Sequence, residues 1–522
     1  MLRWIITLAG LTALLASCGQ MDTSSGGNLD FTFARQAIDG PCPESPTSSA
    51  TPPNLDRLDI TLFTQDGLEH YSKSLSVTSG QAPKAGGISE GENLTLQVIG
   101  YEGGSAAWSG AASGINILAG KSSSASVFMT PIGDISCAQQ PLVFPRAFLS
   151  AAAMGDGRFL LIGGVDNTVA DFCGADCDLM TASASVDIFD PGTGMIYPTT
   201  KLNTPRTLAT ATALPNGTVL VVGGASRVSA DIATGLPLTV NQADLIKTFE
   251  IYLPAEKLWI EKPMPVGFVF HSATSLGDGR VLLVGGGVGF GTDQASESAY
   301  MFDPAAGESV GTMVKVQSNM ASPRFGHAAV LTASGSVLIV GGATYPTAPI
   351  IEEFTPSAEG GVFASKGFAG SPGNLFFHDA KIIPLRPDEI LVAGGSFFDG
   401  DDSLNAPLNT NVRILSQIST PEIQSTEGPA MTEPHLMHFL TTTADNHLVI
   451  AGGFIDLLLT PGQTVEAFDP TTSALSNPTN LSISRGGHVT LRVTGGRALI
   501  AGGLGPDGLL GSAELFTPAM GP

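Results

Sequence analysis

The sequence predicts an all-β protein built from many short strands and organised in more than one folded part. Gly 64 and Pro 35 among 522 residues, with 7% aromatic residues, are typical of short strands joined by turns. Segments such as NLTLQVIGY (93–101) alternate apolar and polar side chains, as half-buried strands do. In the C-terminal three quarters, a diglycine that follows a four-residue apolar run occurs seven times. That spacing indicates a repeat architecture.

The N-terminus has the features of an export signal. Arg3 is followed by an apolar run from Trp4 to Leu15 and then by small residues, so residues 1–17 are predicted to be a signal peptide. An ordinary secretory signal with an incidental cysteine is the alternative.

Leu15-Ala16-Ser17-Cys18 resembles the lipobox of bacterial lipoproteins. The resemblance implies that Cys18 becomes the N-terminal residue and carries the lipid, palmitate included. Gly19, where an Asp would imply retention in the inner membrane, implies the outer membrane. Membrane attachment is then expected through the lipid alone.

Two segments separate this signal from the repeats. Residues 18–55 are rich in Ser, Thr, Pro and Gly and are predicted to be a flexible tether. Residues 56–136 are predicted to form a small antiparallel β-sandwich-like domain. Its expected strands are LDITLF (58–63), KSLSVTS (73–79), NLTLQVIGY (93–101), INIL (115–118) and ASVFMT (125–130), with a Gly/Ala/Ser turn region before INIL.

Four cysteines follow Cys18, and an even number in an exported chain indicates disulfides. Three pairings are open. The short CGADC segment favours Cys173 with Cys177, which leaves Cys42 for Cys137. A zinc site at Cys173 and Cys177 is the alternative, and the sequence offers no second ligand pair at zinc spacing.

The repeats extend from about residue 140 to the C-terminus. Each has a strand often opened by Pro-Arg, a turn such as GDGR, the diglycine strand, and a third strand such as FEIYLP (249–254). The diglycines end at Gly164, Gly224, Gly286, Gly342, Gly395, Gly453 and Gly503.

These motifs resemble the kelch family, and the resemblance implies a seven-bladed kelch-type β-propeller over residues 137–522. Glycine is expected where a strand passes too close to its neighbour for a β-carbon. The fourth-strand Trp of the family stands clearly only at Trp259. Because the chain ends one strand short of a complete last blade, the segment from Ala138 to Phe144 is expected to supply the missing strand.

Five histidines occupy similar repeat positions and are the candidate site, at the mouth of the central channel. His271, His327, His438 and His488 lie 14 residues before the first glycine of their diglycine, and His378 lies 16 before, with RPDE read as lengthening its turn. Converging neutral imidazoles could bind copper or zinc. The alternative is that histidine here belongs to the kelch pattern and bonds to the backbone of a neighbouring blade.

The net charge of −23 argues against a nucleic-acid partner. No catalytic motif is found, so no cofactor is expected. A non-catalytic binding or scaffold propeller for a protein or glycan partner, monomeric and anchored at the cell envelope, is the leading hypothesis. The alternative is an oxidoreductase with a metal site on the propeller axis, related by fold to galactose oxidase, although the copper-site residues of that family have no match here.

Overall fold

The computed structural model describes residues 26–36, 42, 49–50, 54–77, 83–167, 179–231, 236–287, 295–307, 310–342, 351–369, 377–378, 381–397, 408–443, 446–456 and 458–519. The fold is all-β, with 57% strand and 1% helix, as predicted. The one helix in this part of the chain is a short 3-10 turn, η1 (Gln242–Asp244). Within the same residues, no helix has the length and apolar character needed to span a membrane.

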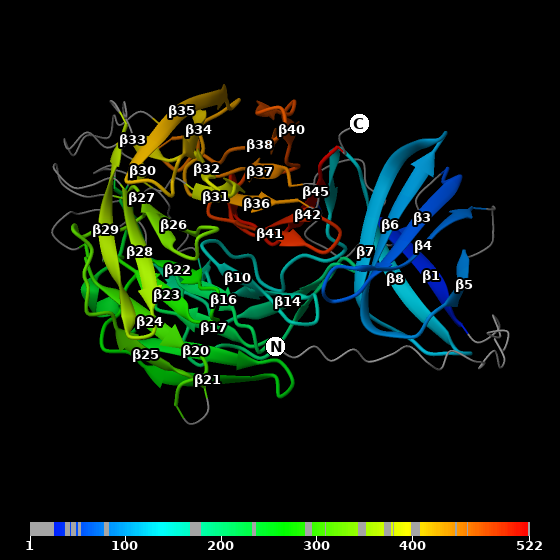
Figure 1. Ribbon diagram of the computed structural model, residues 1–522, viewed down its shortest axis with the longest axis horizontal. Coiled ribbons are helices and arrows are strands. Elements are labelled where there is room, and N and C mark those ends of the chain that lie inside the picture. Colours follow the sequence, from blue (N-terminus) through cyan, green and yellow to red (C-terminus); the bar gives the residue numbers. More distant parts are fainter. Residues whose placement is uncertain are drawn as a thin grey trace, which may run out of the picture.

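An eight-stranded sheet forms the N-terminal part of the molecule (Figure 1). Its order is β2-β1-β8-β7-β6-β3-β4, and β5 pairs with β1. Because β4 and β5 also contact each other, the sheet nearly closes into a barrel and is not a sandwich of two sheets. The strands are β1 (Gly27–Gln36), β2 (Ser49–Ala50), β3 (Arg57–Phe63), β4 (Glu69–Ser76), β5 (Lys84–Ile88), β6 (Gly91–Glu102), β7 (Ser105–Ile117) and β8 (Ser122–Pro131).

The predicted flexible tether over residues 18–55 is wrong for β1. This segment pairs in parallel with β8 and in an antiparallel arrangement with β5. Leu29 and Phe31 are buried in the core of the barrel. The local alternation in NLDFTF therefore outweighs the Ser- and Gly-rich composition around it.

The predicted turn region before INIL is confirmed only at Gly103 and Gly104, between β6 and β7. It is wrong from Ser105 on, where β7 pairs with both β6 and β8. Its small residues lie where large neighbours cross the strand. A β-carbon at Gly110 would stand 2.6 Å from the Met129 sulfur and from a methyl carbon of Val127. Close packing selects small residues here, and turn formation does not.

Seven four-stranded antiparallel arrangements follow, numbered here as units 1 to 7 after their diglycines. In strand order they are β10-β11-β14-β15, β16-β17-β20-β21, β22-β23-β24-β25, β26-β27-β28-β29, β31-β32-β34-β35, β36-β37-β38-β39 and β41-β42-β45-β9. Units 4 and 5 join into one eight-stranded sheet through parallel pairing of β29 with β35. In unit 6, β40 pairs with β38, as β39 does.

The strand bounds of units 1 to 4 are β10 (Ser150–Ala153), β11 (Phe159–Ile162), β14 (Val186–Asp190), β15 (Met195–Pro198), β16 (Thr210–Ala213), β17 (Val219–Val222), β20 (Thr248–Leu253), β21 (Leu258–Pro263), β22 (Ser272–Ser275), β23 (Val281–Val284), β24 (Ala299–Asp303), β25 (Thr312–Lys315), β26 (Ala328–Leu331), β27 (Val337–Val340), β28 (Ile351–Ser357) and β29 (Gly360–Phe368). Those of units 5 to 7 are β31 (Lys381–Arg386), β32 (Glu389–Ala393), β34 (Asn411–Ser416), β35 (Glu422–Ala430), β36 (Phe439–Thr442), β37 (Leu448–Ala451), β38 (Thr464–Asp469), β39 (Ala474–Leu475), β40 (Thr479–Asn480), β41 (Val489–Val493), β42 (Arg497–Ala501), β45 (Ala513–Thr517) and β9 (Asp134–Cys137).

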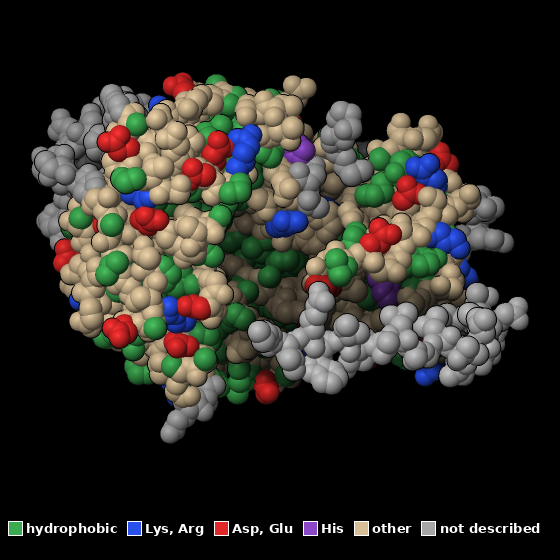
Figure 2. All heavy atoms as spheres, in the orientation of Figure 1, with side chains coloured by type: hydrophobic (Ala, Val, Ile, Leu, Met, Phe, Trp, Pro, Cys, Tyr) green, Lys and Arg blue, Asp and Glu red, His purple; other side chains and the backbone are tan. Residues whose placement is uncertain are grey.

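The first strands of the seven units contact one another in a closed ring, β10, β16, β22, β26, β31, β36, β41 and back to β10 (Figure 1). Apolar clusters fill the space between neighbouring units, including the space between unit 7 and unit 1. The arrangement is β-propeller-like. The ring and the N-terminal barrel leave a hollow between them, in which hydrophobic side chains are visible (Figure 2).

The N-terminal side of the chain completes unit 7, but not with the predicted segment. The closing strand is β9, in which Ile135 pairs with Phe516 and Cys137 with Glu514. The predicted segment from Ala138 to Phe144 lies outside the sheet. It contains Pro141 and leaves Val143 and Phe144 about half exposed, so it cannot form a regular ladder on a buried edge.

The barrel is fastened to units 1 and 7 by a fully buried arginine, Arg497. Its guanidinium donates to the carbonyl oxygens of Phe128 (2.9 Å) and Pro191 (2.9 Å), and Phe128 packs in the apolar cluster shared by these two units. Burial lowers the pKa of Arg497 to about 10, so it remains charged at neutral pH. These contacts fix the position of the barrel relative to units 1 and 7.

Short sheets are formed by segments that follow the diglycines and their neighbours. The largest joins loops of units 1 and 2, in the order β12 (Val165–Asn167), β13 (Leu179–Ala182), β18 (Arg227–Asp231) and β19 (Leu236–Thr239). Two others are pairs, β30 (Phe377–His378) with β33 (Ser396–Phe397) and β43 (Leu504–Gly505) with β44 (Gly508–Leu509).

Candidate functional site

The diglycines connect each unit to the next. Both glycines of every pair have positive φ, from 49° to 106°. A β-carbon at Gly223 would stand 2.6 Å from the carbonyl oxygen of Phe268 in unit 3, and the Gly224 N–H donates to that same oxygen (3.1 Å). The expected steric reason for glycine is confirmed.

The same bond recurs round the ring. The second-glycine N–H donors and their carbonyl acceptors are Gly164 to Arg206, Gly224 to Phe268, Gly286 to Arg324, Gly395 to His435, Gly453 to Arg485 and Gly503 to Arg146. The last of these returns from unit 7 to unit 1, so the diglycine strands also close the ring.

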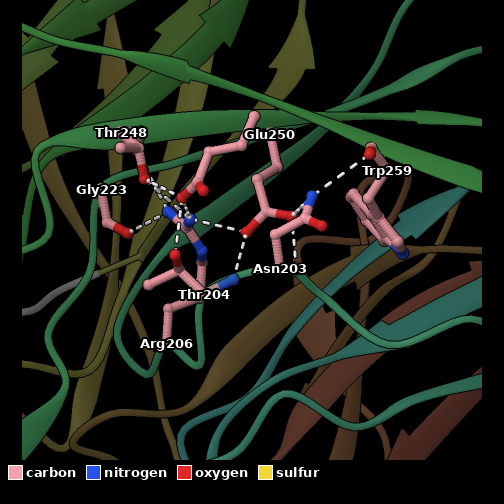
Figure 3. Close-up of polar contacts among 8 residues, drawn as sticks. Asn203, Thr204, Arg206, Gly223, Thr248, Glu250 and Trp259 are labelled. Atoms are coloured by element: carbon pink, nitrogen blue, oxygen red, sulfur yellow. Dashed lines mark hydrogen bonds and ion pairs between the residues drawn. The ribbon is translucent and has the colours of Figure 1, made fainter.

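Four units also have a buried ion pair that the sequence reasoning missed, shown for unit 2 in Figure 3. Arg206 donates to the Gly223 carbonyl oxygen (2.9 Å) and pairs with Glu250 (2.8 Å). Glu250 also accepts from the backbone N–H groups of Asn203 and Thr204. Both charged groups are fully buried, and each offsets the charge of the other.

Three other units repeat this ion pair, each with its arginine donating to the first glycine of its own diglycine. The pairs are Arg146 with Asp187, Arg324 with Glu352 and Arg485 with Glu514. The repeated Pro-Arg and the acidic residue of the third strand were the available sequence signal. These buried charges connect the segment before the first strand to the diglycine and to the third strand of the same unit.

In the remaining units, other residues occupy the position of the arginine, of the carboxylate, or of both. In unit 3, Phe268 and Tyr300 occupy the two places, with ring centroids 5.9 Å apart. In unit 6, His435 donates from Nδ1 to the Gly452 carbonyl oxygen (2.5 Å). In unit 5, Arg413 occupies the place of the carboxylate on the third strand.

Four of the five candidate histidines lie together. His271, His327, His438 and His488 each immediately precede the first strand of their unit. They line a cavity of about 230 Å³ to which all seven units contribute, together with Phe148, Leu149, Leu208, Ala209, Thr210, Phe270, Gly326, Lys381, Met437, Phe439 and Gly487.

The fifth candidate, His378, is described only by its backbone. It lies in β30, whose backbone pairs it with Ser396, and it stands three residues before the first strand of unit 5. Lys381 pairs with Ala393, which keeps the usual distance between first strand and diglycine, so RPDE does not lengthen this unit. The side chain of His378 lies outside the described part of the chain.

The cavity histidines link neighbouring units. His271 Nε2 bonds the Thr210 hydroxyl of unit 2 (2.9 Å), and His327 Nε2 bonds the Ser272 hydroxyl of unit 3 (2.8 Å). These partners are side chains, where the kelch pattern led us to expect backbone. The imidazole of His488 lies against the backbone of Ala451 and Arg485, and for His438 no hydrogen-bond partner is found among the described residues.

All four imidazoles are neutral at physiological pH. Burial lowers the pKa of His271 and of His488 to about 3. The pKa values of His327 and His438 also lie well below 6.5, chiefly because of burial. Neutral imidazole is the form that binds metals, but within the described residues no three His, Cys, Asp or Glu side chains converge on a metal position.

The residue before each candidate position has unusual backbone. Phe148, Leu208, Phe270 and Met437 have φ between 48° and 54°, and in units 4 and 7 this residue is Gly326 or Gly487. Large side chains rarely adopt positive φ, and such strain persists where the surroundings over-determine it. Here neighbouring units supply backbone bonds, such as Phe148 N–H to the Gly487 carbonyl oxygen (2.7 Å). The result is a rigid apolar rim on the cavity.

One predicted disulfide is confirmed: Cys42 is bonded to Cys137, with Cα atoms 5.4 Å apart. It joins the segment after β1 to the end of the closing strand β9. Cys18, Cys173 and Cys177 lie outside the described residues.

The fold and the cavity define a β-propeller-like all-β protein with a cavity at the centre of its ring of first strands. A scan against protein-family models finds no match, and a search of curated proteins finds no significant relative.

Proposed function

We propose that the chain is a seven-bladed kelch-type β-propeller, anchored to the cell envelope by a lipid on Cys18, which binds a protein or glycan partner at its diglycine end without catalysing a reaction. The repeated diglycine bonds, the ring of first strands and the outer-strand closure by β9 support the propeller. The lipid anchor is supported by the lipobox resemblance at residues 15–18.

One observation carries the assignment of the binding face: chain length varies at one end of the ring. The links between second and third strands range from 10 residues (341–350) to 25 (223–247). The links between first and second strands, at the opposite end, have no more than five residues. Loops of varied length on a rigid scaffold are where binding proteins place recognition.

Photo-crosslinking tests the binding face with two matched positions. Leu458, in the loop of unit 6 at the diglycine end, and Val314, on the outer strand of unit 3, are equally exposed at 58%. A photoreactive residue at position 458 should give discrete adducts in envelopes of the native host, and one at position 314 should give none. Equal adducts from both positions, or none from position 458, would count against this face.

The anchor is tested separately. Cys18→Ser should move the protein from the membrane fraction to the soluble fraction, because the lipid is the proposed membrane attachment. Unchanged membrane partition of this variant would show that Cys18 is not the anchor.

A further inference from the structure

We propose that one end of the N-terminal barrel contacts the lipid bilayer, with Leu68 and Leu118 inserted among the headgroups of zwitterionic lipids. This surface is distinct from the partner-binding face at the diglycine end. The inference rests on the proposed lipid at Cys18, which brings the barrel to the membrane.

The start of β1 places this end of the barrel close to Cys18 along the chain. β1 begins at Gly27, and a β-carbon there would stand 2.7 Å from the Leu118 carbonyl oxygen. Seven residues separate Cys18 from Gly26, the first described residue. Even fully extended, a chain of that length spans less than about 30 Å. A lipid on Cys18 therefore keeps this end of the barrel within that distance of the bilayer.

Two turns with exposed leucines lie side by side at this end. Leu118 is in the turn between β7 and β8, and Leu68 is in the turn between β3 and β4. Gly91, at the start of β6, lies between the turns, because it pairs with Ile117 and a β-carbon on it would stand 3.1 Å from His70 Nε2. Among the described residues of the barrel, these two leucines are the large apolar side chains that are exposed.

Hydrogen bonds hold both leucines at the tips of ordered turns. The Leu68 N–H donates to the Thr64 hydroxyl oxygen (3.2 Å), and the Thr64 N–H donates to the Leu68 carbonyl oxygen (2.9 Å). In the other turn, the Lys121 N–H donates to the Leu118 carbonyl oxygen (3.1 Å). Because the turns are already ordered, inserting the leucines costs little chain entropy. Single exposed leucines are ordinary, but these two share the end that the lipid holds near the apolar phase of the membrane.

The charges around the tips indicate the kind of lipid. Four carboxylates are exposed in or beside these turns, those of Asp66, Glu69, Glu90 and Glu92. Glu90 Oε1 accepts from the Ala119 N–H (3.1 Å), so its carboxylate lies beside the Leu118 turn, in which Lys121 is also exposed. Carboxylates outnumber cations here, and they repel anionic headgroups. A zwitterionic headgroup carries no net charge and is therefore favoured.

The bilayer contact and the binding face use different parts of the molecule. The barrel meets the ring at turns between first and second strands. Ser113 bonds the Thr494 hydroxyl (3.3 Å), and a β-carbon at Gly157 would stand 2.7 Å from the Ser113 side chain. These turns are at the end of the ring opposite the diglycines. The barrel therefore contacts the ring away from the proposed binding loops.

Photo-crosslinking to lipid tests the contact in the lipidated full chain, reconstituted in phosphatidylcholine vesicles. A photoreactive residue replaces Leu68 (64% exposed) or Leu118 (44%), and matched controls on the ring replace Val362 (60%) or Leu258 (49%). We expect at least about fivefold more lipid adducts at positions 68 and 118, because only these positions enter the headgroup layer. Equal yields at all four positions, or no lipid adducts at 68 and 118 in membrane-bound protein, would overturn the contact. In native envelopes, adducts to protein in place of lipid at position 68 would assign this end to a protein partner and reject the proposal.

Lipid composition tests the charge argument. Phosphatidylglycerol in place of about a third of the phosphatidylcholine should lower the adduct yield at position 68 at least about twofold at low ionic strength, and added salt should restore it. The double variant Glu69→Gln, Glu92→Gln should depend less on phosphatidylglycerol, since two of the repelling charges are gone. A yield that rises with phosphatidylglycerol would contradict the preference for zwitterionic lipid.

Fractionation of Cys18→Ser reports on the anchor separately. If that variant is soluble and the lipidated chain gives no lipid adducts at positions 68 and 118, the anchor is retained and the contact is rejected. If the variant stays in membranes and still gives these adducts, the anchor is rejected and the contact is retained.

Discussion

Phe268 and Tyr300 stand in unit 3 where four other units place a buried arginine and its carboxylate, and their rings lie 5.9 Å apart. An apolar pair has replaced a salt bridge at an equivalent place in one fold. Such a replacement is often neutral or stabilising, whereas half of a buried ion pair is strongly destabilising.

This relationship predicts a strongly coupled double-mutant cycle. Phe268→Arg and Tyr300→Glu should each destabilise the protein by about 3–5 kcal/mol, because each leaves a buried charge unpaired. The double variant should recover at least half of the summed loss, since the two charges then pair as Arg206 and Glu250 do. Urea unfolding of the four proteins measures the coupling, and additive losses would contradict the equivalence of the two places.

The closing strand predicts a contrast between two aspartate substitutions. Ile135 pairs with Phe516 and packs against the core between units 6 and 7, whereas Phe144 is 48% exposed. Ile135→Asp should cost about 2–4 kcal/mol, and Phe144→Asp less than about 1 kcal/mol. Thermal unfolding monitors both. A larger loss of stability for Phe144→Asp than for Ile135→Asp would contradict β9 as the closing strand and favour the segment from Ala138 to Phe144.

The disulfide predicts sensitivity to reductant. The Cys42–Cys137 bond closes a sequence separation of 95 residues, for which chain entropy gives a stabilisation of about 4–5 kcal/mol. Reduction, or replacement of both cysteines by serine, should lower the unfolding free energy by up to that amount. The doubly substituted protein is the control, because added reductant should change its urea midpoint no further unless another disulfide matters.

The buried histidines predict loss of stability in acid. The folded-state pKa values of His271 and His488 are about 3, below the 6.5 expected when unfolded, so the unfolded chain binds more protons below pH 6.5. This contribution is complete above about pH 6.5 and falls as pH drops toward 3, by several kcal/mol in all. His271→Gln should flatten the decline in unfolding free energy between pH 6.5 and 4. An unchanged slope would show that His271 does not contribute.

Local patterns in the sequence were sufficient for the all-β class and the diglycine strands, whereas the pairing of Cys42 with Cys137 was only favoured among three open pairings. The reason is that strand alternation and the restriction on positive φ act on a few neighbouring residues. At Gly223 the positive φ is such a local restriction, whereas the carbonyl oxygen 2.6 Å from a β-carbon there belongs to Phe268 in the next unit.

Tertiary structure alone decided which segments meet. Composition suggested a tether where β1 lies, yet Leu29 and Phe31 fill a barrel core that exists only once β8 is beside them. The closing strand is β9, because the ladder with β45 sets a register that residue spacing does not contain. The different surroundings of His271 and His488 follow from Thr210 and Phe439, residues about fifty to sixty positions away. Contacts between distant residues depend on the closed ring, and no local pattern encodes them.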